Sequence, residues 1–492
     1  MTMLEQINLM AALPELLLLA AISVYVLVEA LMGQTRQLPL DKMALSVIAV
    51  PAVVTLFQIG SVPEVAFNGM YVADAFSHLL KIFVYIAIAA TVIYARDYGR
   101  DRGLHKGEFY SLTLFAMLGQ MVMISAGNLL VVYMGLELMS LSLYALAALR
   151  RDEAQSTEAA IKYFILGALA SGFLLYGMSM LYGGTGDLSL SGIAAAFGSA
   201  ETNRTVLMLG AVFIVAGLAF KFGAVPFHMW VPDVYQGTPN SITLLIAGAP
   251  KLAAFAIAFR LLGEGLIPIA VQWQPMLIVL AVGSLAIGNI VAIAQTNFKR
   301  MIAYSTIAQI GFVMLGLMSG VVDGSASSAG QAYGASMFYI ITYVLTTLGT
   351  LGIVMMMARK GFECQEISDF KGLSRRSPLM AVVMLIMMFS LAGIPPTVGF
   401  FAKLTVLQAA INAGHVWLAV VAVMTSLIGA FYYLRIVKVM YFESAEDDSP
   451  LTTRFDARSV LAVNGAAVLV LGIIPNPLMN ACIEAVRQAL GS

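Results

Sequence analysis

Five lysines lie within, or a turn or two from, long apolar segments of this 492-residue chain: Lys81, Lys162, Lys221, Lys251 and Lys403. A lysine near the centre of a bilayer costs roughly 2.5–3.5 kcal/mol. Several such residues in one chain therefore indicate a use for them, and the usual use is a path for ions or protons. Lysine suits a site that gains and loses protons, because its pKa shifts readily on burial, whereas arginine stays charged.

A glutamate, Glu137, occurs in the middle of the apolar segment VVYMGLELMSLSLYAL. We interpret it as a titrating partner for a lysine, because a nearby carboxylate holds an ammonium group in its charged form. The alternative is a protonated carboxyl that is hydrogen-bonded within the helix bundle. Lys221, which precedes the sequence GAVP, and Lys251, which follows Pro250, are the lysines that this interpretation pairs with Glu137.

Two polar residues follow Lys221 closely. We interpret His228 as a proton relay, because histidine titrates near neutral pH; the alternative is a core histidine with a satisfied ring. Asp233 is equally consistent with a functional charge and with a cap of a short helix. Lys403 follows a second segment rich in glycine and proline, and it has no comparable structural explanation.

Lys162 and Lys81 have competing structural interpretations. Lys162 lies four residues after Glu158, so the two can form an ordinary ion pair on one helix face near the membrane edge. Lys81 shares a segment with Asp74 and His78, and for this lysine we favour a group that reaches the membrane surface with its charged end. On that interpretation, Lys81→Met should have only a mild effect.

The composition is that of a membrane protein that works in a lipid bilayer. Mean hydropathy is +0.89, and 11% of residues are charged, whereas soluble domains carry about 25%. A formal net charge of zero gives no electrostatic basis for binding nucleic acid. Cys364 and Cys482 are far apart, and no glycine-rich nucleotide loop or metal-ligand spacing occurs. We therefore expect no cofactor and no metal on this chain, and no nucleic-acid partner.

These residues must be positioned by membrane-spanning helices. We predict an all-α, polytopic membrane fold with about fourteen transmembrane helices, because apolar runs long enough to cross a ~30 Å hydrocarbon core recur along the chain. The seventh predicted span is followed by Gly223 and two prolines, and the twelfth contains Gly393 and two prolines, so both are expected to be interrupted. The predicted spans are 9–32, 41–59, 72–95, 108–125, 128–148, 158–182, 204–224, 240–262, 273–295, 301–321, 331–358, 378–413, 415–441 and 458–480.

The distribution of basic residues predicts the orientation. Most of the 27 lysines and arginines lie in or beside loops on one side of the predicted membrane. The opposite side holds only Arg204, Arg260 and Arg487, and the remaining cations are the five lysines named above. Basic loops stay in the cytoplasm, so an even number of spans places both termini outside. The first eight residues include Glu5 and no basic residue, which is unlike a signal peptide.

Sequence blocks recur at an offset of about 170 residues. LGQMVMISAGN, ending at Asn128, is similar to IGNIVAIAQTN, ending at Asn297, and GAVPFHMWVPD (223–233) is similar to GIPPTVGFFAK (393–403). Because the offset covers five spans, the second copy is inverted relative to the first. Inverted repeats with a broken helix in each copy are typical of secondary transporters, and each break predicts a hydrated cavity; the alternative is a tolerated proline kink. We expect one membrane domain, with three N-terminal helices (1–105), a first repeat (106–270), a second repeat (271–443) and a C-terminal helix (444–492).

The run KFGAVPFHMWVPDVYQGTP (221–239), followed by Pro250-Lys251, resembles the antiporter-like membrane subunits of complex I. The span count and the broken, inverted repeats extend this resemblance over nearly the whole chain. The family includes relatives in Mrp-type cation/proton antiporters and membrane-bound hydrogenases. Within it, INLMAALPELLLLAAI near the start and LAGIPPTVGFFAKLTVLQAAI (391–411) most closely resemble the subunit N branch of NADH-quinone oxidoreductase.

The resemblance implies a proton-translocating unit of a larger NADH:quinone oxidoreductase in a bacterial inner (plasma) membrane, with both termini on the periplasmic side. It implies that NADH, FMN, iron–sulfur clusters and quinone are bound by other subunits, that the partners are other membrane-arm subunits, and that quinone reduction is coupled to this chain only indirectly. By the same resemblance, the proton pathway comprises Glu137, Lys162, Lys221, Lys251, Lys403 and His228.

Two other function classes remain open. An independent cation/proton antiporter subunit would be expected to place carboxylates beside its broken helices, where this chain places mainly lysines. A structural connector of the membrane arm would gain nothing from five intramembrane lysines.

Overall fold

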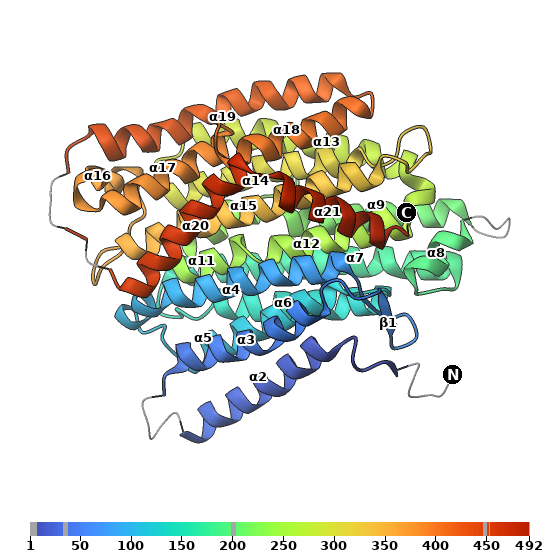
Figure 1. The fold of residues 1–492 in the computed structure, drawn as a ribbon, viewed down its shortest axis with the longest axis horizontal. Coiled ribbons are helices and arrows are strands. Elements are labelled where there is room, and N and C mark those ends of the chain that lie inside the picture. Colours follow the sequence, from blue (N-terminus) through green and yellow to red (C-terminus); the bar gives the residue numbers. More distant parts are fainter. Residues whose placement is uncertain (1–6, 33–37, 198–202, 446–449, 452, 492) are drawn as a thin grey trace.

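The computed structural model describes residues 7–32, 38–197, 203–445, 450–451 and 453–491 (Figure 1). Within these residues the chain is almost entirely helical, and the one sheet is a two-stranded antiparallel hairpin. Thirteen helical segments are long and apolar enough to cross a membrane. Two shorter apolar helices, Pro378–Ala392 and Val398–Asn412, together supply the remaining predicted crossing. The predicted all-α, polytopic class is confirmed.

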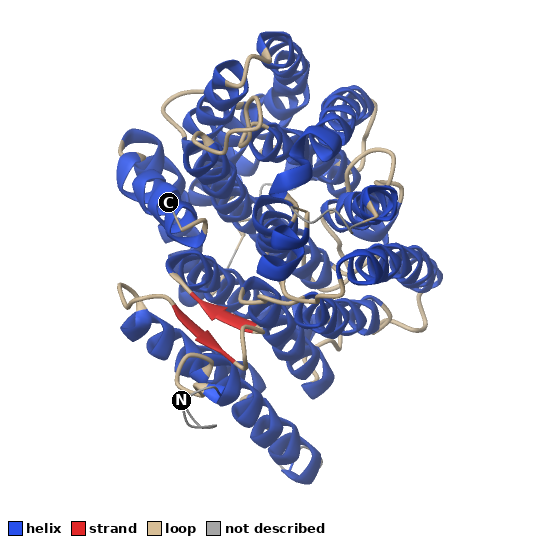
Figure 2. Cartoon of the chain, turned by 90° about the vertical axis from the view of Figure 1, so that its right-hand side faces the viewer, coloured by secondary structure: helices blue, strands red, loops and turns tan. Residues whose placement is uncertain are grey.

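Three helices precede the repeats. They are α2 (Leu13–Met32), α3 (Leu40–Gln58) and α4 (Ala75–Asp101), and the hairpin of β1 (Glu64–Ala66) and β2 (Tyr71–Ala73) joins the last two. Figure 2 shows the hairpin lying beside these helices at the end of the bundle that faces the viewer. The start of α2 and the end of the last helix also lie at this end (Figure 1), which we call the terminal end. We call the opposite end, which carries loop residues such as Arg102 and Arg376, the basic end.

The first repeat consists of α5 (Gly107–Ile124), α6 (Leu129–Ala147), α7 (Ala154–Thr185), α9 (Arg204–Phe222), α10 (Trp230–Gly237), α11 (Asn240–Ala247), α12 (Pro250–Ala258) and the π-helical η1 (Phe259–Gly265). The short helix α8 (Leu190–Ala196) follows α7, and η2 (Ile267–Ile269) leads into the second repeat. The predicted interruption after α9 is present. A further interruption between α11 and α12 was not predicted; it lies directly before Lys251.

The second repeat consists of α13 (Ala270–Ile293), α14 (Phe298–Met318), α15 (Ala329–Met357), α17 (Pro378–Ala392), α18 (Val398–Asn412) and α19 (Val416–Phe442). The short η3 (Ile367–Phe370) and α16 (Leu373–Arg376) lie between α15 and α17. The chain ends with α20 (Phe455–Ile473) and α21 (Asn476–Ala489). The predicted last span, 458–480, therefore extends past the end of α20.

Equivalent local features support the internal repeat. Asn128 caps α6 and Asn297 caps α14, each by accepting a backbone N–H bond with its side chain. A Cβ atom added at Gly119 would lie 2.6 Å from the Gly135 carbonyl oxygen, and one added at Gly288 would lie 2.8 Å from that of Tyr304. Glycine thus allows the same close approach of α5 to α6 and of α13 to α14.

Candidate functional site

The first break separates α9 from α10. Gly223 ends α9 in the left-handed region with φ 76°, and a cis Val225–Pro226 bond follows. Glycine adopts this conformation without a Cβ clash, and proline has no N–H to continue the helix. The Lys251 Nζ, from the first turn of α12, donates to the carbonyl oxygens of Phe222 at 2.8 Å and of Lys221 at 3.4 Å. The Lys251 side chain is buried and lies over the ring of Trp230.

The second break separates α17 from α18 in the same way. Gly393 ends α17 with φ 83°, and a cis Pro395–Pro396 bond follows. The Lys403 Nζ donates to the carbonyl oxygens of Leu391 at 2.9 Å and of Ala392 at 3.0 Å. It also donates to the Ser426 hydroxyl of α19 at 2.7 Å. Each break therefore has a buried ammonium group on the last carbonyls of its first half-helix.

The C-terminal carbonyls of a helix have no intrahelical partner and carry the negative end of the helix dipole. They favour the charged form of a lysine, whereas burial disfavours it. Neither Lys251 nor Lys403 has a carboxylate within ion-pair distance among the described residues. The two lysines are thus held by dipoles alone, an arrangement in which a modest change in the surroundings can alter protonation.

Lys221 lies in the last turn of α9 and faces α6 and α7. Its Nζ donates to the hydroxyls of Ser140 at 2.9 Å and of Ser171 at 3.4 Å. Glu137 lies one turn before Ser140 on α6 and interacts electrostatically with Lys221. The Oε1 atom of Glu137 is buried and has no hydrogen-bond partner in the part of the chain that the structure describes. Hydrogen bonds therefore do not hold Glu137 at both oxygens, and its role as a partner of Lys221 stays a prediction.

Lys162 and Asp233 belong to one ionic group beside the first break. Lys162 lies 2.7 Å from both Glu158 and Asp233, and the other Asp233 oxygen lies 2.8 Å from Arg300 of α14. The alternative that Asp233 caps α10 is wrong, because Met229 is the N-cap residue and no side chain caps this helix. The ion pair with Glu158 is present, but Lys162 also joins α7 to α10.

His228 lies in the loop between α9 and α10 and is half-buried. Its Nδ1 is buried without a hydrogen-bond partner among the described residues. The structure thus places His228 in the first break, as predicted, without a contact that assigns its role.

The first break also contacts the second repeat. The backbone N–H of Val225 donates to the Ser284 hydroxyl of α13 at 3.0 Å, and the Lys299 Nζ of α14 donates to the Thr238 carbonyl at 2.6 Å. Lys299 lies in the first turn of α14, and only 2% of the residue is exposed. Lys299 stabilises the end of α10.

A row of amide and hydroxyl groups leads away from the second break. Gln309 donates to the Leu391 carbonyl and to the Tyr433 hydroxyl, each at 3.0 Å, and accepts a bond from Tyr339. A small cavity lies among these groups, lined in part by Thr346 and Ser390. Sequence reasoning missed this row. The sequence feature that could have indicated this row is the run of tyrosines and threonines along 339–350.

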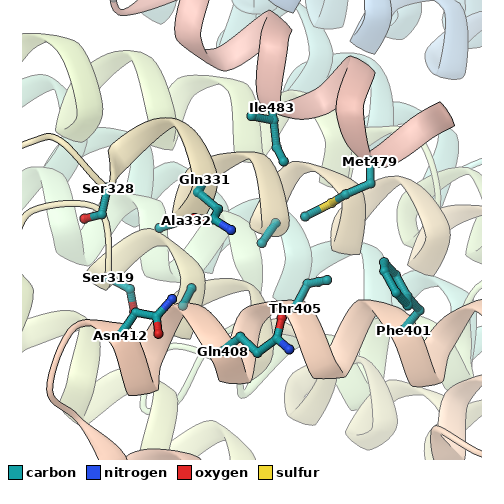
Figure 3. A pocket seen from close by; sticks show the side chains of 12 residues that line it. Ser319, Ser328, Gln331, Ala332, Phe401, Thr405, Gln408, Asn412, Met479 and Ile483 are labelled. Atoms are coloured by element: carbon teal, nitrogen blue, oxygen red, sulfur yellow. The ribbon is translucent and has the colours of Figure 1, made fainter. Parts of the chain in front are cut away.

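A pocket of about 200 Å³, lined by polar and apolar side chains, lies beside the C-terminal part of α18 (Figure 3). Thr405, Gln408 and Asn412 line it from α18, and Gln331 lines it from α15. Met479 of α21 closes one side. The residues of α18 that line this pocket follow the second break, so the hydrated cavity expected at each break stays a prediction.

The interpretation of Lys81 as a group at the membrane surface is wrong. Lys81 is fully buried and forms a 2.6 Å ion pair with Glu15 of α2. Arg260, which sequence analysis placed on the side opposite the basic loops, is 2% exposed and pairs with Asp74 at the terminal end. Removing one member of a buried pair leaves an uncompensated charge and costs about 3–5 kcal/mol. Lys81→Met is therefore no longer expected to be mild.

Comparisons with known proteins agree with this architecture. Residues 126–429 match the family model described as NADH:quinone oxidoreductase/Mrp antiporter, TM. NADH-quinone oxidoreductase subunit N of Herminiimonas arsenicoxydans is 55% identical over 99% of this chain and all of its own length. A chain of respiratory complex I from Thermus thermophilus is 32% identical, with a TM-score of 0.80 over 95% of this chain and 99% of that chain.

A chain of the Mrp complex from Dietzia has a TM-score of 0.85 over 98% of both chains, but its 20% identity indicates a shared fold only. The matched family model covers more than half of the chain, and the relative from Herminiimonas is similar from end to end. The chain therefore belongs to the NADH-quinone oxidoreductase subunit N family of antiporter-like membrane proteins.

Proposed function

We propose that this chain is a proton-translocating membrane subunit of a bacterial NADH-quinone oxidoreductase. The observation that carries the proposal is the pair of buried lysines, Lys251 and Lys403, bound to equivalent helix-end carbonyls at the two breaks. Two buried ammonium groups held by dipoles rather than by carboxylates are suited to reversible protonation.

In the first repeat, the carboxylate of Glu137 stabilises the Lys221 ammonium group. Protonation of Glu137 removes this stabilisation, so burial then favours release of the Lys221 proton. Lys251 is the next acceptor, because its Nζ is hydrogen-bonded to the backbone of Lys221 itself. His228 and Lys162 flank this region and complete the proposed pathway in the first repeat.

From the first repeat, the pathway continues through the amide and hydroxyl row around Gln309 to Lys403. The pocket lined by Thr405 and Gln408 would connect Lys403 to the terminal end. Moving one proton against 100 mV requires about 2.3 kcal/mol, and an electrostatic change of about 2.7 kcal/mol shifts a protonation equilibrium roughly a hundredfold. One charge switch is therefore adequate for one proton.

We propose that NADH, FMN, iron–sulfur clusters and quinone are bound by other subunits, and that this chain contacts the membrane-arm subunits and the lipid bilayer. The single, buried thiols of Cys364 and Cys482 are unsuited to ligating a cluster. Both termini are proposed to be periplasmic, because the basic end carries most loop cations. Reporter fusions after residue 370 and at the C-terminus should report opposite sides.

An Mrp-type cation/proton antiporter is disfavoured by the state of Asp233. This carboxylate lies on α10, directly after the first break, and Lys162 and Arg300 already neutralise it. A cation site needs an available carboxylate.

The test is Lys221→Met in the assembled complex. Proton translocation in membrane vesicles and quinone-linked turnover should fall, while NADH oxidation by an artificial acceptor should persist. Assembly should survive, because the substitution removes a buried charge without leaving a partner in a contact ion pair. Lys438→Met, at a side chain that is 71% exposed, is the matched control. Wild-type translocation by Lys221→Met would refute the pathway.

A further inference from the structure

A buried ionic cluster lies at the terminal end of the bundle, outside the row of groups that joins the two breaks. Its members come from the N-terminal helices, the hairpin and the end of the first repeat, and sequence reasoning did not connect them. We call it the terminal cluster, and it consists of Glu15, Tyr71, Asp74, His78, Lys81, Arg260 and Glu264.

One half of the terminal cluster is a closed triad. The Lys81 Nζ lies 2.6 Å from Glu15 Oε1 and donates to the Tyr71 hydroxyl at 2.8 Å. The Tyr71 hydroxyl in turn donates to Glu15 Oε2 at 2.6 Å. The positive and negative charges in this half are equal.

The other half is built on the π-helical segment η1. Arg260 donates to both carboxylate oxygens of Asp74, at 3.0 Å and 2.8 Å, and lies 2.7 Å from Glu264. The side chains of Arg260 and Asp74 are 2% exposed, whereas that of Glu264 is 20% exposed. This half therefore has two carboxylates and one cation, and its second carboxylate is the one nearest to the surface. π-Helical turns occur frequently at functional sites.

His78 lies between the two halves on α4, four residues after Asp74 and three before Lys81, and it interacts electrostatically with both. It is 3% exposed, and its Nε2 is buried with no hydrogen-bond partner among the described residues. Residues at these spacings are neighbours on one helix face. His78 thus has a buried ring nitrogen without a partner and interacts with one charged residue of each half, Asp74 and Lys81.

With Glu15, Asp74, Glu264, Lys81 and Arg260 ionised and His78 neutral, the cluster has three negative and two positive charges. An uncompensated charge in a protein interior costs several kcal/mol. We propose that the terminal cluster is a proton-binding site that takes up one exchangeable proton, carried either by Glu264 or by His78. The assignment does not depend on the proposed pathway, because none of its residues belongs to that pathway.

The charged residues around the terminal cluster do not change its excess of one negative charge. Glu64 of β1 is exposed, and the helix α21, which packs against α4, contributes one acid and one base, Glu484 and Arg487. A metal ion is a less suitable ligand, because the described residues contain no group of three or more acidic, histidine or cysteine side chains arranged to hold one. The carboxylates that could bind it are already paired with Lys81 and Arg260.

The test is labelling of the assembled complex with a hydrophobic carbodiimide, which modifies protonated carboxyl groups in apolar surroundings. Modification of the Glu264 peptide is quantified by mass spectrometry between about pH 5.5 and 8.5. We expect labelling at Glu264 that falls about tenfold per pH unit above its midpoint, as for one titrating proton. Glu264→Gln should abolish it, and Glu15, held by Lys81 and Tyr71, should stay unmodified.

His78→Phe tests whether His78 is the second acceptor of the proton. With His78 removed, the proton has one acceptor, so the labelling midpoint of Glu264 should move to higher pH. His415→Phe, at another histidine of the terminal end, is the matched control and should leave the midpoint unchanged. Labelling of Glu137 without labelling of Glu264 at any pH would overturn the proposal, and so would an unchanged midpoint in His78→Phe. Neither outcome bears on proton translocation by Lys221 variants.

Discussion

The two breaks place an ammonium group on equivalent carbonyl oxygens but take it from different elements. At the first break the lysine is Lys251, from the following helix α12; at the second it is Lys403, from the second half of the broken helix itself. At the position equivalent to Lys403, the first repeat has Asp233, which pairs with Lys162 and Arg300. The two repeats share a lysine ammonium group that is hydrogen-bonded to carbonyls at a helix end, but the lysine comes from a different position in each repeat.

The surroundings of the two cations differ in chemistry. The first break has Glu137 and Lys221 close by, whereas the offsets of the two repeated blocks, 169 residues (Gly119 to Gly288) and 170 residues (Gly223 to Gly393), place Thr306 and Leu391 at these positions in the second repeat. Thr306 accepts a hydrogen bond from Tyr343 at 2.8 Å and donates to the Ile302 carbonyl at 2.9 Å. In the proposed pathway, the first repeat therefore switches charge, while the second conducts through hydrogen-bonding groups around one lysine.

The largest expected effect separates these two chemistries. Glu137→Gln should lower proton translocation about tenfold, equivalent to about 1.4 kcal/mol on a barrier, because it removes the charge that acts on Lys221. The matched change in the second repeat, Thr306→Val, should lower it by less than about twofold, because it removes hydrogen bonds but no titrating group. Translocation normalised to assembled complex is the measurement. An equal loss of translocation in Glu137→Gln and Thr306→Val would contradict the proposed chemical difference between the two repeats.

A smaller effect tests what the two breaks have in common. Lys251→Arg and Lys403→Arg keep a positive charge and N–H donors, but arginine does not release its proton. We expect each to lower translocation on the order of fivefold, about 1 kcal/mol, with assembly retained. Lys438→Arg, at an exposed site, is the control. If both arginine variants translocated protons like the wild type, the lysines would be helix caps only.

The smallest effect concerns a histidine far from the breaks. His105 lies in the loop between α4 and α5 and is bonded to the Tyr110 hydroxyl at 2.8 Å. Burial lowers the pKa of His105, and the nearby Arg100 lowers it further. The unfolded chain then binds the proton more readily, so the stability contributed by His105 is complete above about pH 6.5 and is lost as pH falls through the lowered pKa.

His105→Gln should therefore flatten the decline of thermal stability of the assembled complex below about pH 6.5 and leave the pH dependence of translocation unchanged. If His105→Gln instead changed the pH dependence of translocation and left thermal stability unchanged, His105 at the basic end would contribute to the pH dependence of translocation.

Local sequence was sufficient for the crossings and for the two breaks. Runs of apolar residues determine the length of each crossing, and Gly223 and Gly393 with their following prolines end α9 and α17 because of backbone sterics alone. The N-caps Asn128 and Asn297 were likewise visible as matching ends of the repeated blocks. Features of this kind depend on residues within a turn or two of one another.

Only the tertiary structure decided which charges meet. The ion pairs Lys81–Glu15 and Arg260–Asp74 join residues that are remote in sequence, and sequence analysis predicted neither pair. The carbonyl groups that bind Lys251 and Lys403 could not be predicted from the sequence either. Every residue has a backbone carbonyl, and only those at helix ends lack an intrahelical hydrogen bond and can accept one from a side chain. Spacing along the chain reports which face of a helix a residue occupies, but its electrostatic partner is set by the helix packed against that face.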